Sequence, residues 1–207
     1  MFAKVRTTRD LFEAFGYNEQ KVQERTAECL LGENYLLDLK SLSTQDKLDR
    51  LEERNLLYER VQCNVLRISL NFHFGETISN EKMQVVAKRY MTDMGLDRQP
   101  YLGYRHYDTA HPHLHIVSTV IEADGSRIKA GLAFIRKSAQ VSRLLEDEFS
   151  LSKNKKITIL DEEKLKVSSA ERVVYGKKPL RQSISNVLYV VIDHYKYTNL
   201  AELNAVL

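Results

Sequence analysis

The chain has 207 residues, of which 43% are hydrophobic and 29% charged, the balance of a globular protein with enough length for one sizeable domain. No stretch reaches the ~20 consecutive apolar residues of a membrane helix, and residues 1–10 do not begin a secretory signal, so we expect no membrane insertion. The net charge of +3 is compatible with nucleic acid as a partner but does not by itself indicate one.

Helices and one strand are predicted in the first half of the chain. Residues 19–39 and 44–62 read as helices, the second with an apolar stripe and a solvated charged face. Residues 65–74 alternate with a period of two, which predicts a strand. Its apolar face holds Leu66, Ile68, Leu70, Phe72 and Phe74, and its polar face holds Arg67, Ser69, Asn71 and His73.

The second half begins with the clearest helix, from Ser79 to Met94, which Ser79 or Asn80 can cap and Gly95 can end. Strands are predicted over 101–107 and 113–121, joined by a short turn at 109–112. Asp124-Gly125 is a hairpin turn signal that would start a further strand near Arg127. Helices are predicted over 138–149 and 182–196.

This order of elements predicts an α+β domain with a mainly antiparallel sheet. A new helical pattern starts at 198–203 and stops at Leu207. We therefore interpret 181–207 as a helical C-terminal segment that is cut short, and residues 1–207 as the N-terminal part of a longer protein.

The two cysteines, Cys29 and Cys63, lie far apart and have no metal-ligand neighbours in sequence. We expect free thiols in a reducing compartment. This spacing excludes a cysteine-based zinc site.

Histidines are the strongest signal, because residues 105–117 hold four of the six. His113 and His115 lie two apart, so they project from the same face of a strand, and His106 shares a face with Leu102 and Tyr104. If the turn at 109–112 makes the two strands antiparallel neighbours, His106 lies beside the other two. Three imidazoles on one sheet face can hold a divalent ion and leave positions open for substrate.

Other polar residues lie near this cluster in sequence. Asp108 can accept a ligand histidine's second N–H and fix its tautomer. Glu76 is a second carboxylate that we consider for the site. His111 is separated from the strand by Pro112 and has no such role in the pattern.

The pattern His106-x-Asp108 followed by His113-Leu114-His115 resembles the metal motif of relaxases, the mobilization nucleases of plasmids and integrative elements, which are HUH endonucleases. Residues 99–119 and Ser69-Leu70-Asn71-Phe72 closely resemble relaxases of Bacteroidetes mobile elements. Tyr17-Asn18-Glu19-Gln20-Lys21-Val22 looks like the family's tyrosine motif, of the class with a single catalytic tyrosine. The alternative tyrosines are Tyr35, Tyr104 and Tyr107. The family's usual Asn or Asp near position 111 is histidine here.

The resemblance implies a relaxase nuclease domain with about five antiparallel strands. Its histidines would lie on one sheet face, with helices on the other and Tyr17 brought over the metal. His106, His113 and His115 would hold Mg²⁺ or Mn²⁺, with Asp108 beside them. Tyr17 would nick and rejoin one strand at a transfer origin through a 5′-phosphotyrosyl intermediate.

The implied partners are single-stranded DNA, accessory relaxosome proteins and a coupling protein, in the bacterial cytoplasm. Phosphates would meet basic side chains. The leading candidates are Lys21, Arg25, Arg105 and Arg127, and the wider set adds Lys4, Arg6, Arg9, Lys129, Arg136 and Lys137.

Three other interpretations remain open. His111-x-His113-x-His115 also fits the histidine-triad pattern of nucleotide hydrolases and transferases, in which His113 would be the nucleophile without a metal. The histidines could instead hold a structural zinc in a non-catalytic DNA-binding module. A rolling-circle replication initiator shares the histidines, but its tyrosine usually follows them in the chain, whereas Tyr17 precedes them.

Overall fold

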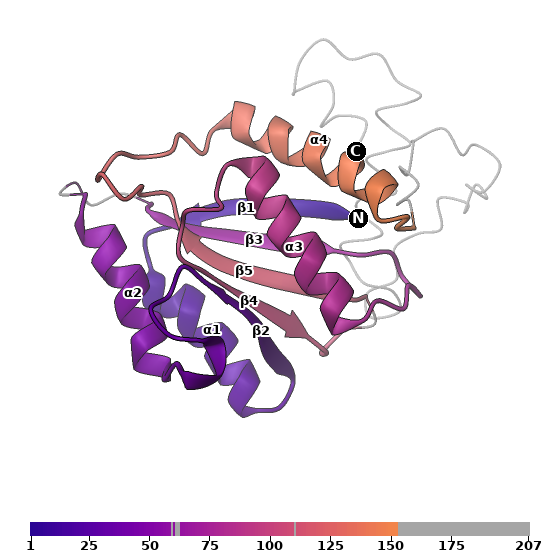
Figure 1. Cartoon of the computed structure of the whole chain (residues 1–207), viewed down its shortest axis with the longest axis horizontal. Helices are drawn as coiled ribbons and strands as arrows, with labels where there is room; N and C mark the ends of the chain where they lie inside the picture. The colour runs from indigo at the N-terminus through magenta and orange to yellow at the C-terminus, as the bar shows by residue number, and fades with distance from the viewer. Residues whose placement is uncertain (59, 61–62, 110, 153–207) are drawn as a thin grey trace, which may run out of the picture. The chain divides into compact units, whose positions relative to one another are not determined.

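The computed structural model describes residues 1–58, 60, 63–109 and 111–152, which form an α+β domain around one five-stranded sheet (Figure 1). The strand order is β1-β3-β5-β4-β2 and every neighbouring pair is antiparallel, as expected. The strands are Phe2–Thr8 (β1), Ala27–Glu33 (β2), Val65–Asn71 (β3), Tyr101–His106 (β4) and His113–Thr119 (β5). The helices are Leu11–Gln23 (α1), Thr44–Leu56 (α2), Asn80–Met94 (α3) and Leu132–Glu148 (α4), with a 3₁₀ turn at Leu39–Ser41 (η1).

Capping residues set where the helices begin. Asp10 accepts a hydrogen bond from the Glu13 amide at 2.7 Å at the start of α1, and Ser43 forms a reciprocal capping box with Asp46 at the start of α2. The predicted α3 is confirmed: Ser79 caps it and Gly95 ends it in the left-handed conformation.

Helices cover both faces of the sheet. One face packs Leu66, Ile68, Leu70, Leu114 and Ile116 against α3 and α4, and α3 crosses the near face in Figure 1. The opposite face, which carries the histidines, packs against α1 and α2 through a second cluster of Leu11, Ala14, Phe15, Leu51, Val65, Leu102, Tyr104 and Val117. The expectation that helices cover only the face without histidines is therefore wrong, because the apolar residues that share the histidine face also need burial.

The N-terminal third differs most from the sequence-based prediction. The helix predicted over 19–39 is wrong: α1 begins at Leu11 and ends at Gln23, and Ala27–Glu33 is a strand. Arg25 turns the chain between them with a positive φ of 58°. Residues 2–8, for which no element was predicted, form β1. Each change follows from pairing with distant strands, β2 with β4 and β1 with β3, which local periodicity cannot reveal.

Smaller differences concern element ends. β3 stops at Asn71 and β5 at Thr119, α2 ends at Leu56, and α4 begins at Leu132, six residues before the predicted start. The strand predicted near Arg127 is reduced to a single bridge between Ile121 and Arg127. The helix predicted over 182–196 and the segment 181–207 lie outside the described residues. Among the helices that the structure describes, none is long and apolar enough to span a bilayer.

A buried carboxylate anchors α1 to the rest of the domain. Glu19 is 7% exposed. Its Oε1 accepts a hydrogen bond from the Tyr104 hydroxyl on β4 at 2.6 Å and lies 3.0 Å from the Lys47 ammonium on α2. Burial raises the pKa of Tyr104 well above its ordinary value, so this hydroxyl stays protonated and donates. These contacts fix the rotation of α1 about its axis and therefore the direction in which its neighbouring residues point.

We expect Lys47→Met to lower the free energy of unfolding by about 3–5 kcal/mol, because it leaves the Glu19 carboxylate buried without its cationic partner. Urea denaturation followed by circular dichroism measures this. Adding Glu19→Gln should recover part of the loss. The matched control Lys40→Met, at an exposed lysine, should cost less than about 0.5 kcal/mol. Equal losses in the two single variants would contradict this account of the anchor.

Candidate metal centre

Three histidines meet at one end of the sheet. The register of β4 with β5 sets His106 opposite His113, and His115 lies two residues further along the same face. The ring centroids are 4.4 Å apart for His106 and His115, 5.4 Å for His106 and His113, and 5.2 Å for His113 and His115. One ring nitrogen from each lies within 4.8 Å of the others. The antiparallel pairing expected from the short turn is confirmed.

Burial keeps two of these imidazoles neutral. It lowers the pKa of His106 to about 4 and that of His115 to about 3, and repulsion from the neighbouring histidines adds to the effect. Neutral imidazole is the form that binds metals. At pH 7, protons therefore do not compete for these ring nitrogens.

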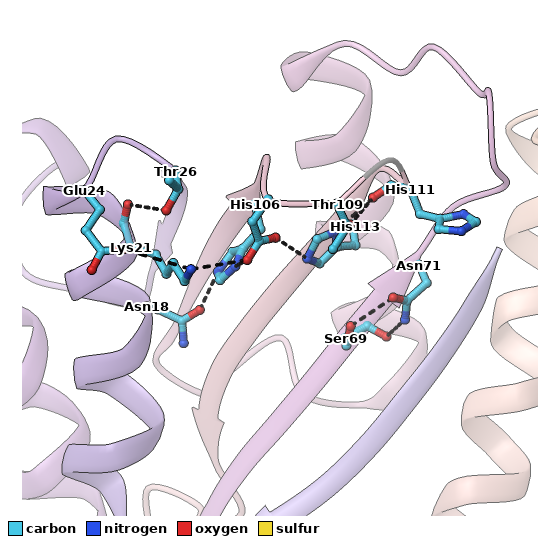
Figure 2. A network of polar contacts seen from close by, with 11 residues as sticks. Asn18, Lys21, Glu24, Thr26, Ser69, Asn71, His106, Thr109, His111 and His113 are labelled. Atoms are coloured by element: carbon cyan, nitrogen blue, oxygen red, sulfur yellow. Dashed lines mark hydrogen bonds and ion pairs between the residues drawn. The ribbon is translucent and has the colours of Figure 1, made fainter. Parts of the chain in front are cut away.

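Hydrogen bonds occupy one ring nitrogen of His106 and one of His113. His106 Nε2 lies 2.8 Å from Asn18 Oδ1 (Figure 2). His113 Nδ1 lies 2.9 Å from the carbonyl oxygen of His111 and 3.1 Å from the Thr109 hydroxyl. His106 Nδ1 is buried and has no hydrogen-bond partner among the described residues. A buried polar atom without a partner is costly, so this arrangement fits a bound cation.

Asp108 does not form the hydrogen bond expected of it. Its carboxylate oxygens are 4.0 Å from His106 Nδ1 and 3.7 Å from His113 Nε2, beyond hydrogen-bond distance. The second ring nitrogens face Asn18 and the His111 carbonyl instead, so Asp108 orients neither ring. It forms an ion pair with Lys21, whose ammonium lies 3.5 Å away. Asp108 thus faces the ring nitrogens that hydrogen bonds leave free.

Tyr17 lies on α1 beside the cluster. Its ring stacks on His106 at a centroid distance of 5.7 Å and an angle of 27°, and lies 6.4 Å from the His115 ring. Its side chain is 40% exposed, so a substrate can reach it. The Lys21 ammonium is 6.0 Å from the centroid of the Tyr17 ring.

The three alternative tyrosines are less suitably placed. Tyr104 is fully buried and donates to Glu19. The Tyr35 hydroxyl donates to the Lys47 carbonyl. Tyr107 donates to Glu28 and contacts Arg105. None of the three has a ring contact with the histidines.

The four leading candidates for DNA contact do not lie together in the structure. Lys21 lies at the cluster, paired with Asp108, and Arg25 is exposed just after α1. Arg105 points to the opposite face of the sheet, where it donates to Asn80 at the start of α3, because alternation along β4 opposes it to His106. Arg127 binds Asn64 and the Cys63 carbonyl at the far end of β3. Arg105 and Arg127 therefore do not join the histidine face.

A different basic group shares that face. Across the sheet, Lys4 of β1 pairs with Ser69 of β3, which pairs with His115 of β5. Arg6 of β1 likewise pairs with Arg67 of β3, two residues along each strand from the pair of Lys4 and Ser69. Lys4 and Arg6 are exposed and Arg67 is half-buried. Alternation in residues 2–8 could have revealed this group had they been read as a strand.

The remaining polar candidates lie outside the cluster. Glu76 accepts from the Ser152 amide, and its second carboxylate oxygen is buried without a partner in the described part of the chain. His73 Nδ1 contacts the Phe74 carbonyl, and the His111 ring packs against Phe74 at 5.1 Å. Because the His111 ring is not among the three clustered rings, the geometry does not favour the histidine-triad interpretation.

Cys29 and Cys63 are free, as expected. Burial raises the pKa of the Cys29 thiol to about 12, so it is protonated and unreactive at neutral pH. Neither cysteine belongs to the histidine group, so the described residues supply that group with three ligands, one fewer than a typical structural zinc site has.

Comparison with known proteins identifies the family of this chain. The chain matches the family described as "Relaxase: MobA/VirD2-like, nuclease domain" over residues 17–151, more than half of its length. A chain from the solved structure described as "Molecular Basis of Vancomycin Resistance Transfer in Staphylococcus aureus" is 13% identical, with a TM-score of 0.37, over 61% of this chain and 72% of that chain. No curated protein is significantly similar. On the family match, the chain belongs to the relaxases, with a MobA/VirD2-like nuclease domain over residues 17–151.

Proposed function

We propose that this relaxase nicks and rejoins one DNA strand at a transfer origin, with Tyr17 as the nucleophile at a metal site held by His106, His113 and His115. The observation that carries the proposal is the exposed Tyr17 ring stacked over the buried, neutral imidazole of His106. The proposed nucleophile therefore lies beside His106 Nδ1, a ring nitrogen without a hydrogen-bond partner among the described residues. The exposure of Tyr17 lets a substrate reach this site. Accessory relaxosome proteins and a coupling protein remain expected partners on the basis of the family alone.

The reaction is a transesterification. The Tyr17 hydroxyl releases its proton as its oxygen attacks the phosphorus and forms a phosphotyrosyl bond to the 5′ side. The bond from phosphorus to the 3′ oxygen breaks, and that oxygen takes up a proton to become a free hydroxyl. One phosphodiester replaces another, so the reverse reaction can rejoin the strand.

Residues of this chain support each part of that step. The Lys21 ammonium lies 6.0 Å from the centroid of the Tyr17 ring, where it can contact the phosphate that Tyr17 attacks. His106 and His115 supply neutral nitrogen ligands and His113 a third ring nitrogen, and a bound divalent cation would offset negative charge on the phosphate. Of the two ions expected, three imidazoles favour Mn²⁺, because Mg²⁺ prefers oxygen ligands.

We also propose that the strand runs over the open part of the histidine face, on β3 and β1. Lys4, Arg6 and Arg67 supply positive charge there, two strands or fewer from His115. Neighbouring strands lie ~4.8 Å apart, so phosphates next to the scissile one are within reach. Phe2 is 53% exposed on the same face and offers a ring on which a base can stack.

Metal binding is tested first. We expect His106→Ala, His113→Ala and His115→Ala each to abolish measurable Mn²⁺ binding in isothermal titration calorimetry, because each removes one of three protein ligands. His73→Ala is the matched control, since its ring lies outside the cluster, and it should bind like wild type. Undiminished binding in the cluster variants would exclude these histidines as the ligands.

Covalent adduct formation tests the nucleophile. With Mn²⁺ and labelled single-stranded DNA from the element's transfer origin, wild type should give a protein–DNA adduct that survives a denaturing gel. Tyr17→Phe should give none, because it lacks the attacking oxygen, while Tyr107→Phe should behave like wild type. An adduct that persists in Tyr17→Phe would move the nucleophile to another tyrosine.

Salt dependence tests the DNA path. Lys4→Ala and Arg6→Ala should each weaken binding of single-stranded DNA and lower the slope of log K against log salt by ~0.7, the loss of about one phosphate contact. Fluorescence anisotropy at several salt concentrations measures this. Arg136→Ala is the control, because Arg136 is exposed on α4, which packs on the opposite face. Equal slopes for all proteins would rule out this path.

A further inference from the structure

Asn18 is a polar side chain in the apolar contact between α1 and the sheet. It is 1% exposed, and the preceding helical turn is occupied by the buried apolar residues Ala14 and Phe15. Its Nδ2 lies 2.7 Å from the Ala14 carbonyl oxygen, and its Oδ1 lies 2.8 Å from His106 Nε2. Figure 2 shows it reaching from α1 to the His106 ring. A buried amide is costly unless paired, so its contacts define what it does.

The two contacts fix the orientation of the amide. The Ala14 carbonyl oxygen can only accept a hydrogen bond, so the Asn18 NH₂ group must face it. The amide oxygen then faces His106 and can only accept. His106 must therefore donate through Nε2–H.

The tautomer of His106 follows from this orientation. A neutral imidazole carries one N–H, so a proton on Nε2 leaves a lone pair on Nδ1. Nδ1 is the ring nitrogen that is buried without a hydrogen-bond partner among the described residues, and it faces Asp108. The Ala14 carbonyl thus determines, through Asn18, which nitrogen of His106 is free to bind an ion.

We propose that Asn18 is a positioning residue that holds His106 in the Nε2–H tautomer and so presents Nδ1 to the metal. The inference deepens the proposed function, because it rests on the same metal site. Hydrogen bonds from metal-binding histidines to a second acceptor fix ring orientation and basicity. His113 has the opposite arrangement, with Nδ1 held by the His111 carbonyl and Nε2 facing the Asp108 carboxylate at 3.7 Å.

The position of Asn18 in the chain has a further consequence. It directly follows Tyr17, and Glu19 after it anchors the same helical turn to Lys47 and Tyr104. One turn of α1 therefore carries the proposed nucleophile, the residue that orients a ligand, and the anchor that holds both in place. A shift of α1 would disturb the nucleophile and the ligand together.

The test compares Asn18→Leu, which removes the acceptor for His106, with Asn18→Asp, which keeps that acceptor but removes the donor to Ala14. Long-range ¹H–¹⁵N spectra of the metal-free protein report the tautomer, with His106 assigned by the signal missing from His106→Ala. Calorimetry with Mn²⁺ reports affinity. The matched control is Gln99→Leu, another buried amide, located before β4 and away from the histidines.

Wild type should show the Nε2–H tautomer. Asn18→Leu should lose that tautomer preference and bind Mn²⁺ ~10–100-fold more weakly. Asn18→Asp should keep the Nε2–H tautomer, because a carboxylate oxygen also accepts from Nε2–H, although it loses the hydrogen bond to Ala14 and lowers stability. Gln99→Leu should change neither tautomer nor affinity. A purely structural role for Asn18 predicts that stability changes while tautomer and affinity do not.

Three results would overturn the inference: an Nδ1–H tautomer of His106 in wild type, wild-type tautomer and affinity in Asn18→Leu, or loss of the Nε2–H tautomer in Asn18→Asp. If Asn18→Leu does not fold, the tautomers of wild type and of Asn18→Asp still decide. A protein with the expected tautomer and Mn²⁺ affinity but no DNA adduct would support the role of Asn18 and contradict the proposed nicking. The two claims therefore fail separately.

Discussion

The site depends above all on the antiparallel register that pairs His106 with His113. Strand side chains alternate between faces, so a slip of one residue would send these imidazoles into the opposite core and bring Leu114 to the site. That slip is prevented because β5 is a central strand, paired on both sides, with Leu114 and Ile116 fully buried beneath it. The apolar core on one face therefore stabilises the arrangement of the histidines on the other.

The second constraint is that helices cover only part of the histidine face. α1 and α2 pack over β4, β5 and the start of β3, where Leu102, Tyr104 and Val117 need burial. Lys4 and Arg6 on β1 stay exposed on the same face. Within the described residues, the site is closed on one side by α1, which carries Tyr17 and Asn18, and open on the side with basic residues. A chain-like anionic substrate can enter from that side without displacing any of the described helices.

Sequence alone predicted the histidine cluster, because a period of two and a short turn are local features. It also predicted the antiparallel sheet and α3 with its caps. It did not predict β1 and β2, which are edge strands fixed by partners 57 to 79 residues away. Because the sequence-based prediction misplaced α1, it did not reveal that Asn18 is buried against the sheet. Because it missed β1, it did not reveal the basic group on the histidine face. Asp108 was expected to orient a histidine because of its spacing, but side-chain distances decide that role and sequence spacing does not show them.

The charges around the cluster favour an anionic substrate. The His106 and His115 imidazoles are neutral, and the nearby Asp108 carboxylate is paired with Lys21, so the charges of these groups nearly cancel. A divalent cation held there would leave a positive excess, next to Lys4, Arg6 and Arg67. Attraction between close charges is strongest where water is displaced. A phosphodiester supplies the missing negative charge, whereas a neutral substrate would leave that excess uncompensated, so the same neutrality that lets the histidines bind a cation also suits the site to DNA.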